Sequence, residues 1–109
     1  MATAYKILGQ SNPAATTSTD LYTVGAGKST IVSTITVCNQ AATDATFRLS
    51  VAEAGVAISG KQYITYDTTV RGNGFVTLTL GITLDATDKI RVYASSATLS
   101  FCAFGSEIS

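Results

Sequence analysis

Alternation of apolar and polar residues with a period of two recurs along the 109-residue chain and limits what it can fold into. Successive side chains of a β-strand point to opposite faces, so this period is typical of strands with one buried face. No stretch holds a helical period, and Gly, Asn, Asp and Ser separate the alternating segments as turn residues do. The predicted strands are residues 4–9, 20–24, 29–39, 45–52, 61–66, 75–84, 89–94 and 99–103.

About eight short strands at a spacing of roughly ten residues predict an all-β fold. We expect a single-domain β-sandwich over residues 1–109, of jelly-roll or immunoglobulin-like kind, with a small barrel as the alternative. A chain of this length has room for one hydrophobic core. The strand order stays open at this stage.

The alternation also predicts which side chains face the core. In residues 29–39 the predicted core face is Ile31, Ile35 and Val37, and the opposite face is Val32, Thr34, Thr36 and Cys38. In residues 75–84 the predicted core face is Leu78, Leu80, Ile82 and Leu84. Phe47, Phe75 and Phe101 occupy alternating positions that predict core packing.

The composition excludes several classes of partner. Seven basic residues balance seven acidic ones without a basic run, which argues against nucleic-acid binding. No apolar run approaches the length of a membrane span, and the N-terminus lacks the pattern of a secretory signal. We therefore expect a reducing compartment and free thiols at Cys38 and Cys102. Only 13% of residues are charged, so much of the surface suits contact with other protein.

Residues suited to catalysis or metal binding are few. The chain has no His, the commonest general base and metal ligand, and its two Cys lie in separate strands. All five of its Asp residues lie beside predicted turns, where Asp side chains bond the local backbone. A calcium site from Asp85 and Asp88 with Asp44 or Asp67 is the one metal alternative, although it lacks any ligand spacing. We expect no enzyme activity, no cofactor and no metal.

The sequence GKST at residues 27–30 matches the end of a phosphate-binding loop. The full motif needs Gly at position 22, where this chain has Tyr22, and a helix where residues 31–37 predict a strand. We interpret the segment as a hairpin turn with an exposed Lys28.

Two groups of residues are candidates for an interface. The second face of residues 29–39 and that of the last strand are too apolar for full exposure and too small for a main core. Either a loop or neighbouring subunits cover them, and the latter predicts a homo-oligomer. Tyrosines are enriched at interfaces. The predicted interface residues are Val32, Thr34, Thr36, Cys38, Tyr63, Tyr66, Tyr93, Cys102 and Phe104.

Four segments carry a resemblance that spans nearly the whole chain. They are AYKILGQ at residues 4–10, LGITL at 80–84, DKIRVYASS at 88–96 and FCAFGSEI at 101–108. The chain resembles small virion structural proteins of tailed bacteriophages, especially those of cyanobacteria and marine bacteria. These motifs are strand and turn sequences and carry no catalytic residues.

The resemblance implies a capsid decoration or cement protein that bridges major capsid subunits and is often trimeric. It implies a place on the capsid surface of the virion, after synthesis in the cytoplasm of the host bacterium. Loops at residues 14–20, 55–62 and 71–74 are the candidates for contact with the shell. A tail or fibre module and a carbohydrate-binding β-domain are the alternatives.

Overall fold

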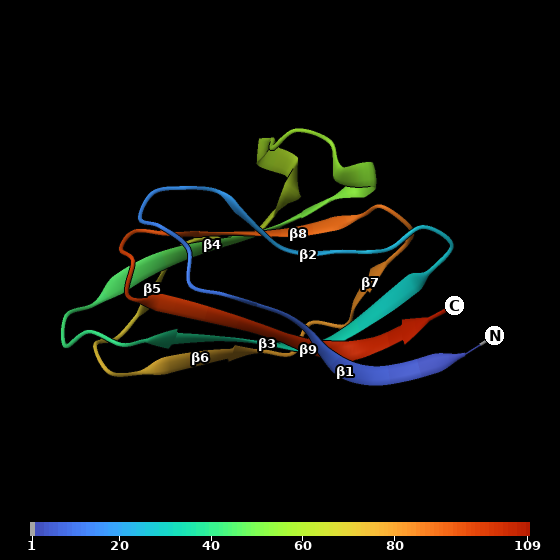
Figure 1. The fold of residues 1–109 in the computed structure, drawn as a ribbon. Helices are drawn as coiled ribbons and strands as arrows, with labels where there is room; N and C mark the ends of the chain where they lie inside the picture. Colours follow the sequence, from blue (N-terminus) through green and yellow to red (C-terminus); the bar gives the residue numbers. More distant parts are fainter. Residues whose placement is uncertain (1) are drawn as a thin grey trace.

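The alternating segments form nine strands in the computed structural model, which describes residues 2–109. The strands are β1 (Thr3–Ser11), β2 (Thr19–Thr23), β3 (Ser29–Asn39), β4 (Ala45–Ala52), β5 (Tyr63–Val70), β6 (Phe75–Leu78), β7 (Ile82–Leu84), β8 (Lys89–Ala94) and β9 (Leu99–Ile108). Two short 3₁₀ turns, η1 (Glu53–Gly55) and η2 (Gly60–Gln62), lie in the β4–β5 connection. The strands pack as two antiparallel sheets, so the predicted all-β sandwich is confirmed (Figure 1).

The strand order decides between the two predicted kinds of sandwich. Sheet A has the order β1-β9-β3-β6, with β7 also paired to β3, and sheet B has the order β2-β8-β4-β5. Strand β1 therefore pairs with β9, β2 with β8, β3 with β6 and β7, and β4 with β5. These pairs are those of one long hairpin rolled into two sheets, which is the jelly roll.

The segment predicted as one strand over residues 75–84 is two strands. Residues 79–81 leave the ladder between β6 and β7, and Gly81 has a φ of 63°, a left-handed conformation that glycine adopts without strain. The prediction that Leu80 faces the core is wrong, because the break leaves its side chain 46% exposed. Leu84 at the end of β7 is buried as predicted.

A β-bulge in β3 reverses the predicted faces at its start. The register of β3 with β9 shifts between Val32 and Thr34, so the extra residue Ser33 moves the alternation by one position. Val32 is consequently buried at 1% exposure, whereas Ile31 is 45% exposed. The predictions of Val32 as an interface residue and of Ile31 as a core residue are wrong for this reason.

The core lies between the sheets and joins them through aromatic contact. Phe47 on β4 and Phe101 on β9 are both fully buried, and their rings meet edge to face with centroids 6.1 Å apart. Both phenylalanines were predicted core residues, and both are confirmed. The branched side chains around them include Ile35, Val37, Leu49, Ile90, Val92 and Leu99.

A polar cluster links the sheets near one end of the sandwich. The Tyr22 hydroxyl on β2 donates to Glu107 Oε2 on β9 at 2.6 Å and lies 2.7 Å from the Thr30 hydroxyl on β3. Lys6 Nζ on β1 lies 2.7 Å from Glu107 Oε1. Each polar group of the cluster thereby has a partner, which burial requires.

Candidate interaction surface

The outer side of sheet A carries one continuous set of outward side chains, because directly paired residues of neighbouring strands point to the same side. We call this set the A face. Its members are Tyr5, Ile7, Gln10, Ile31, Thr34, Thr36, Cys38, Phe75, Thr77, Thr83, Ser100, Cys102, Phe104 and Ser106. None of these residues carries a charge.

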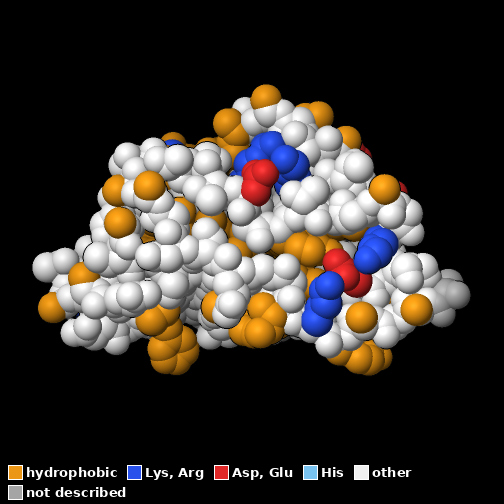
Figure 2. Space-filling view, viewed as in Figure 1, with side chains coloured by type: hydrophobic (Ala, Val, Ile, Leu, Met, Phe, Trp, Pro, Cys, Tyr) orange, Lys and Arg blue, Asp and Glu red, His pale blue; other side chains and the backbone are white. Residues whose placement is uncertain are grey.

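Several large apolar side chains of the A face are open to solvent. Tyr5 is 86% exposed and Phe75 is 74% exposed, while Ile7 and Ile31 are about half exposed. In Figure 2, hydrophobic side chains project from the lower edge, where Figure 1 places sheet A. The charged side chains visible in that view lie on the side of the molecule and over sheet B. Several large apolar side chains exposed on one uncharged face are typical of sites of protein contact.

Most of the interface residues predicted on β3 and β9 meet on the A face. Thr34 pairs with Phe104, and Thr36 pairs with Cys102. Cys38 lies beside them, opposite Ser100, and both cysteines are free thiols. No loop covers Cys38, which is exposed.

Phe75 was predicted in the core and is instead the largest exposed side chain of β6. It pairs with Cys38, so it points to the same outer side as that residue. Leu78 packs against the core as predicted, together with Val76, so the odd-numbered Phe75 lies on the opposite, outer face of the strand. Sequence reasoning therefore missed the most exposed aromatic side chain on this part of the surface.

A hollow of about 380 Å³ opens on the A face near the chain termini. Tyr5, Ile31 and Phe104 are among its walls, and Gly105 contributes no side chain to fill it. A Cβ atom on Gly105 would lie 2.1 Å from the Ile31 carbonyl oxygen, so only glycine allows β9 and β3 to approach this closely. The close approach of β9 to β3 beside the bulge therefore requires this glycine.

The three predicted tyrosines come together on the outer side of sheet B. Tyr63 and Tyr66 meet edge to face at 5.0 Å, and the Arg48 guanidinium lies 4.1 Å from the Tyr66 ring and 4.3 Å from the Tyr93 ring. Arg48 Nε also donates to Asp67 Oδ1 at 2.8 Å, which raises the pKa of Arg48. Because a guanidinium already covers one face of two rings, this cluster holds edge strand β5 against β4 and β8.

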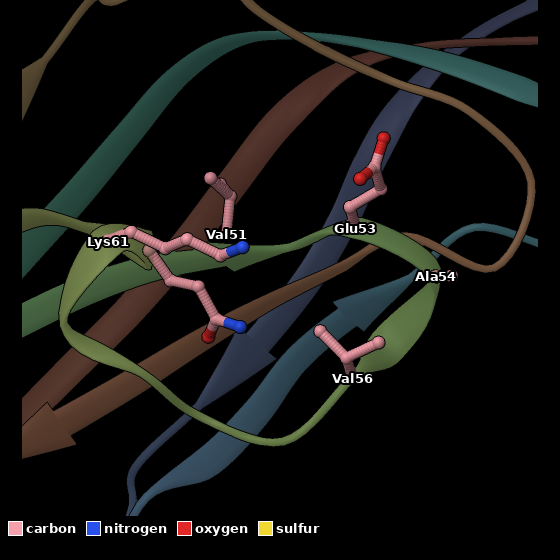
Figure 3. Close-up of a pocket in the computed structure, with 6 residues that line it drawn as sticks. Val51, Glu53, Ala54, Val56 and Lys61 are labelled. Carbon is pink, nitrogen blue, oxygen red and sulfur yellow. The ribbon is translucent and has the colours of Figure 1, made fainter.

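Another hollow, with a volume of about 570 Å³, lies under the β4–β5 connection. Figure 3 shows Val51 and Lys61 on one side of it and Ala54 and Val56 on the other, with Glu53 between. Gln62 Nε2 donates to the Ala57 carbonyl at 2.9 Å, while Gln62 Oε1 is buried without a partner among the described residues. The lining offers the Gln62 amide, the Glu53 carboxylate and the Lys61 ammonium, and its six residues include no hydroxyl or thiol group.

The carboxylates considered for calcium act separately in turns and ion pairs. Asp88 accepts from the backbone N–H groups of Ala54 and Asp85, and Asp44 accepts from that of Gly72. Asp67 pairs with Arg48. Within residues 2–109, no three His, Cys, Asp or Glu side chains gather closely enough to hold a metal ion.

Lys28 of the GKST segment lies in the turn between β2 and β3 and is followed by strand, as interpreted from the sequence. The interpretation of this turn as a hairpin is wrong, because β2 and β3 belong to different sheets and pair with other strands. The ammonium group of Lys28 lies 4.0 Å from Glu107 Oε1 and so adds to the polar cluster between the sheets.

In the part of the chain that the structure describes, no helix has the length and apolar character needed to cross a bilayer.

No protein-family model matches the chain, and no curated protein matches it.

Proposed function

We propose that this protein is a structural protein of a phage virion, a capsid decoration protein that assembles with copies of itself and bridges major capsid subunits. The observation that carries the proposal is the A face, an uncharged sheet surface with Tyr5 and Phe75 largely exposed. Such a surface is suited to assembly, because its coverage removes apolar area from water and the one charged group at its hollow, Lys6, is already paired with Glu107.

The energetics of a repeated shell suit this surface. Full burial of one large apolar side chain contributes roughly 1.5–3 kcal/mol, and the A face offers several such side chains. A protein that binds only the assembled shell stabilises it by mass action at every site. Many sites with modest affinity therefore strengthen a shell without any catalytic group.

The virion assignment is supported by the resemblance of residues 4–10 and 80–108 to small structural proteins of tailed phages. The jelly roll is also an architecture of viral capsid domains, although lectins share it and architecture alone does not determine function. The partners of this proposal are other copies of the chain and the major capsid protein, on the outer surface of the capsid.

The loops proposed for shell contact divide between two places. Residues 14–18 are exposed, small and uncharged, and Thr16 is tied to the end of β8 by a bond from its N–H to the Ala94 carbonyl at 2.8 Å. Residues 71–74 lie at the same end of the sandwich, drawn on the left in Figure 1. The connection over residues 55–62 lies over sheet B instead. We therefore assign contact with the capsid protein to the first two loops.

The test is the copy number of the chain in purified virions of the phage that encodes it, measured by mass spectrometry with labelled peptide standards. A decoration protein is present at a copy number comparable with that of the major capsid protein. Absence from virions contradicts a virion role, and a copy number far below that of the capsid protein assigns the chain to the tail.

A further inference from the structure

A protruding side chain and a hollow lie at opposite ends of the A face. Phe75 stands 74% exposed on edge strand β6, beside Cys38 near the end of β3. The hollow bounded by Tyr5, Ile31 and Phe104 lies near the start of β3. Ile31 precedes Cys38 by seven residues, which corresponds to roughly 20 Å along a strand.

The hollow is large enough and apolar enough for an aromatic ring. Its volume is about 380 Å³, whereas a closed apolar cavity of about 150 Å³ holds benzene. Two aromatic rings and one branched side chain surround the space, and aromatic side chains pack well against one another. No carboxylate lies among the lining residues, and the only ammonium group there is that of Lys6, which is bound to Glu107.

Symmetry turns this arrangement into a self-complementary surface. A two-fold axis in the plane of the A face, midway between Phe75 and the hollow, places each Phe75 over the hollow of the other copy. Thr34 and Thr36 then lie near the axis, where small uncharged side chains allow close approach. An isologous interface has this reciprocal form, in which one residue contacts a second and the second contacts the first.

The dimensions of the face agree with a stable pair. Strand β3 has 11 residues. Three strands close to that length, with β6 and β7 following one another along the other edge of β3, cover at most roughly 36 Å by 19 Å, or about 700 Å² in projection. A standard interface buries about 800 Å² of each partner. Protruding side chains such as Phe75 make the surface area of the A face larger than its projected area.

We propose that the occupant of the A face is a second copy of this chain, with Phe75 of each copy seated in the hollow between Tyr5, Ile31 and Phe104 of the other. The proposal rests on the proposed function in one respect, that the A face is a surface for assembly. It adds the identity of the partner and the two features, Phe75 and the hollow, that fit together.

The first test is sedimentation equilibrium of the full chain and of three variants. Phe75→Ala removes the protruding ring, and Ser106→Phe fills the hollow from the same face. Each lost ring contact raises the dissociation constant by about tenfold or more. Val56→Ala is the matched control, because Val56 is 51% exposed and lies outside the A face.

Mixing the two variants gives the decisive result. A pair of one Phe75→Ala chain and one Ser106→Phe chain retains one intact Phe75 over one open hollow, whereas neither variant retains such a contact with itself. We expect the mixture to associate more tightly than either variant alone. Unchanged association of the Phe75→Ala chain, no gain on mixing, or a trimeric wild-type chain would overturn the reciprocal contact.

The outcome is separable from that of the proposed function. Circular dichroism of each variant first establishes that it is folded. A monomeric wild-type chain that is still abundant in virions overturns this contact and retains the decoration role. Association as described in a chain absent from virions retains the contact and overturns the decoration role.

Discussion

The hydroxyl of Tyr22 donates a hydrogen bond of 2.6 Å to the carboxylate of Glu107, and this contact ties sheet B to sheet A. Burial, and then the bond to the carboxylate, raise the pKa of Tyr22 to about 12, so the hydroxyl remains a donor at neutral pH. The bonds from Lys6 and from Tyr22 hold the pKa of Glu107 below its ordinary value. At neutral pH Tyr22 therefore keeps its proton and Glu107 keeps its negative charge.

Replacing Tyr22 by Phe should lower the free energy of unfolding by roughly 1–3 kcal/mol, because Glu107 and the buried Thr30 lose their shared hydrogen-bond partner. Urea denaturation followed by circular dichroism measures the change. Tyr5→Phe is the control, since Tyr5 is 86% exposed and its ring is retained. Equal midpoints for the two variants would contradict the structural role of this hydroxyl.

The stability of the fold should fall in acid. The pKa of Glu107 is lowered by its bond to Lys6 and then by Tyr22, and that of Asp20 is lowered chiefly by its bond to Lys89. A lowered pKa in the folded state means that the contribution is complete above the unfolded value, about 4, and is lost as pH falls through the folded value. Glu107→Gln should therefore differ most from the wild type near neutral pH and least near pH 2. Parallel stability curves for the two proteins would contradict this account.

Gly105→Ala should destabilise the domain by roughly 1–3 kcal/mol, as overpacking of a central strand does. The added Cβ atom would meet the Ile31 carbonyl oxygen at 2.1 Å and the Val32 Cα at 3.0 Å, and both are backbone atoms that cannot rotate away. Gly60→Ala is the control, because nothing lies within 4 Å of its Cβ position and its φ is not positive. The free energy of unfolding of the Gly60→Ala variant should be unchanged or higher by up to about 1 kcal/mol. Thermal unfolding of both variants checks the pair of expectations.

The bulge at Ser33 predicts a large loss of stability for one substitution and little change for a neighbouring one. Val32→Thr places a hydroxyl in the core without a partner and should lower the unfolding free energy by roughly 1–3 kcal/mol. Thr34→Val lies on the A face and should change it by less than about 0.5 kcal/mol. Uninterrupted alternation from Ile35 would make Val32 the tolerant site, so chemical denaturation of the two variants distinguishes these registers.

Local pattern was sufficient for most of the fold. The predicted bounds of β3, β4 and β8 agree with the structure, since alternation with a period of two marks most of each strand and turn residues flank it. The turn at residues 71–74 also forms as predicted, with Asn73 at a φ of 56°. The pairing of strands in the jelly roll was left open, because it depends on contacts between residues far apart in the chain.

Irregular backbone explains the positions at which the predicted core and surface faces were wrong. One extra residue at Ser33 reverses every side chain before it, and alternation alone does not reveal where a bulge lies. The glycines offered the available signal: Gly105 lies opposite the bulge, and Gly81 lies where residues 75–84 divide. Neither glycine indicates that Phe75 is exposed, and phenylalanine ordinarily prefers burial, so the sequence predicted the wrong environment for this residue.

The sequence predicted which residues of β3 and β9 share the candidate surface, but it did not predict the shape of that surface. Thr34, Thr36, Cys38, Cys102 and Phe104 lie on one face, as the uncharged second faces of two strands indicated. The hollow and the protruding Phe75 depend on the bulge and on the edge position of β6, which only the folded arrangement defines.

The central claim is that the A face is the assembly surface, and sedimentation velocity of charge variants tests it most directly. Thr36→Lys places a charge at the centre of the A face, and Thr46→Lys places the same charge on the outer side of sheet B, also on a central strand. We expect the wild type and Thr46→Lys to sediment as the same oligomer and Thr36→Lys to sediment as a folded monomer. An oligomer that withstands Thr36→Lys but dissociates with Thr46→Lys would contradict the account.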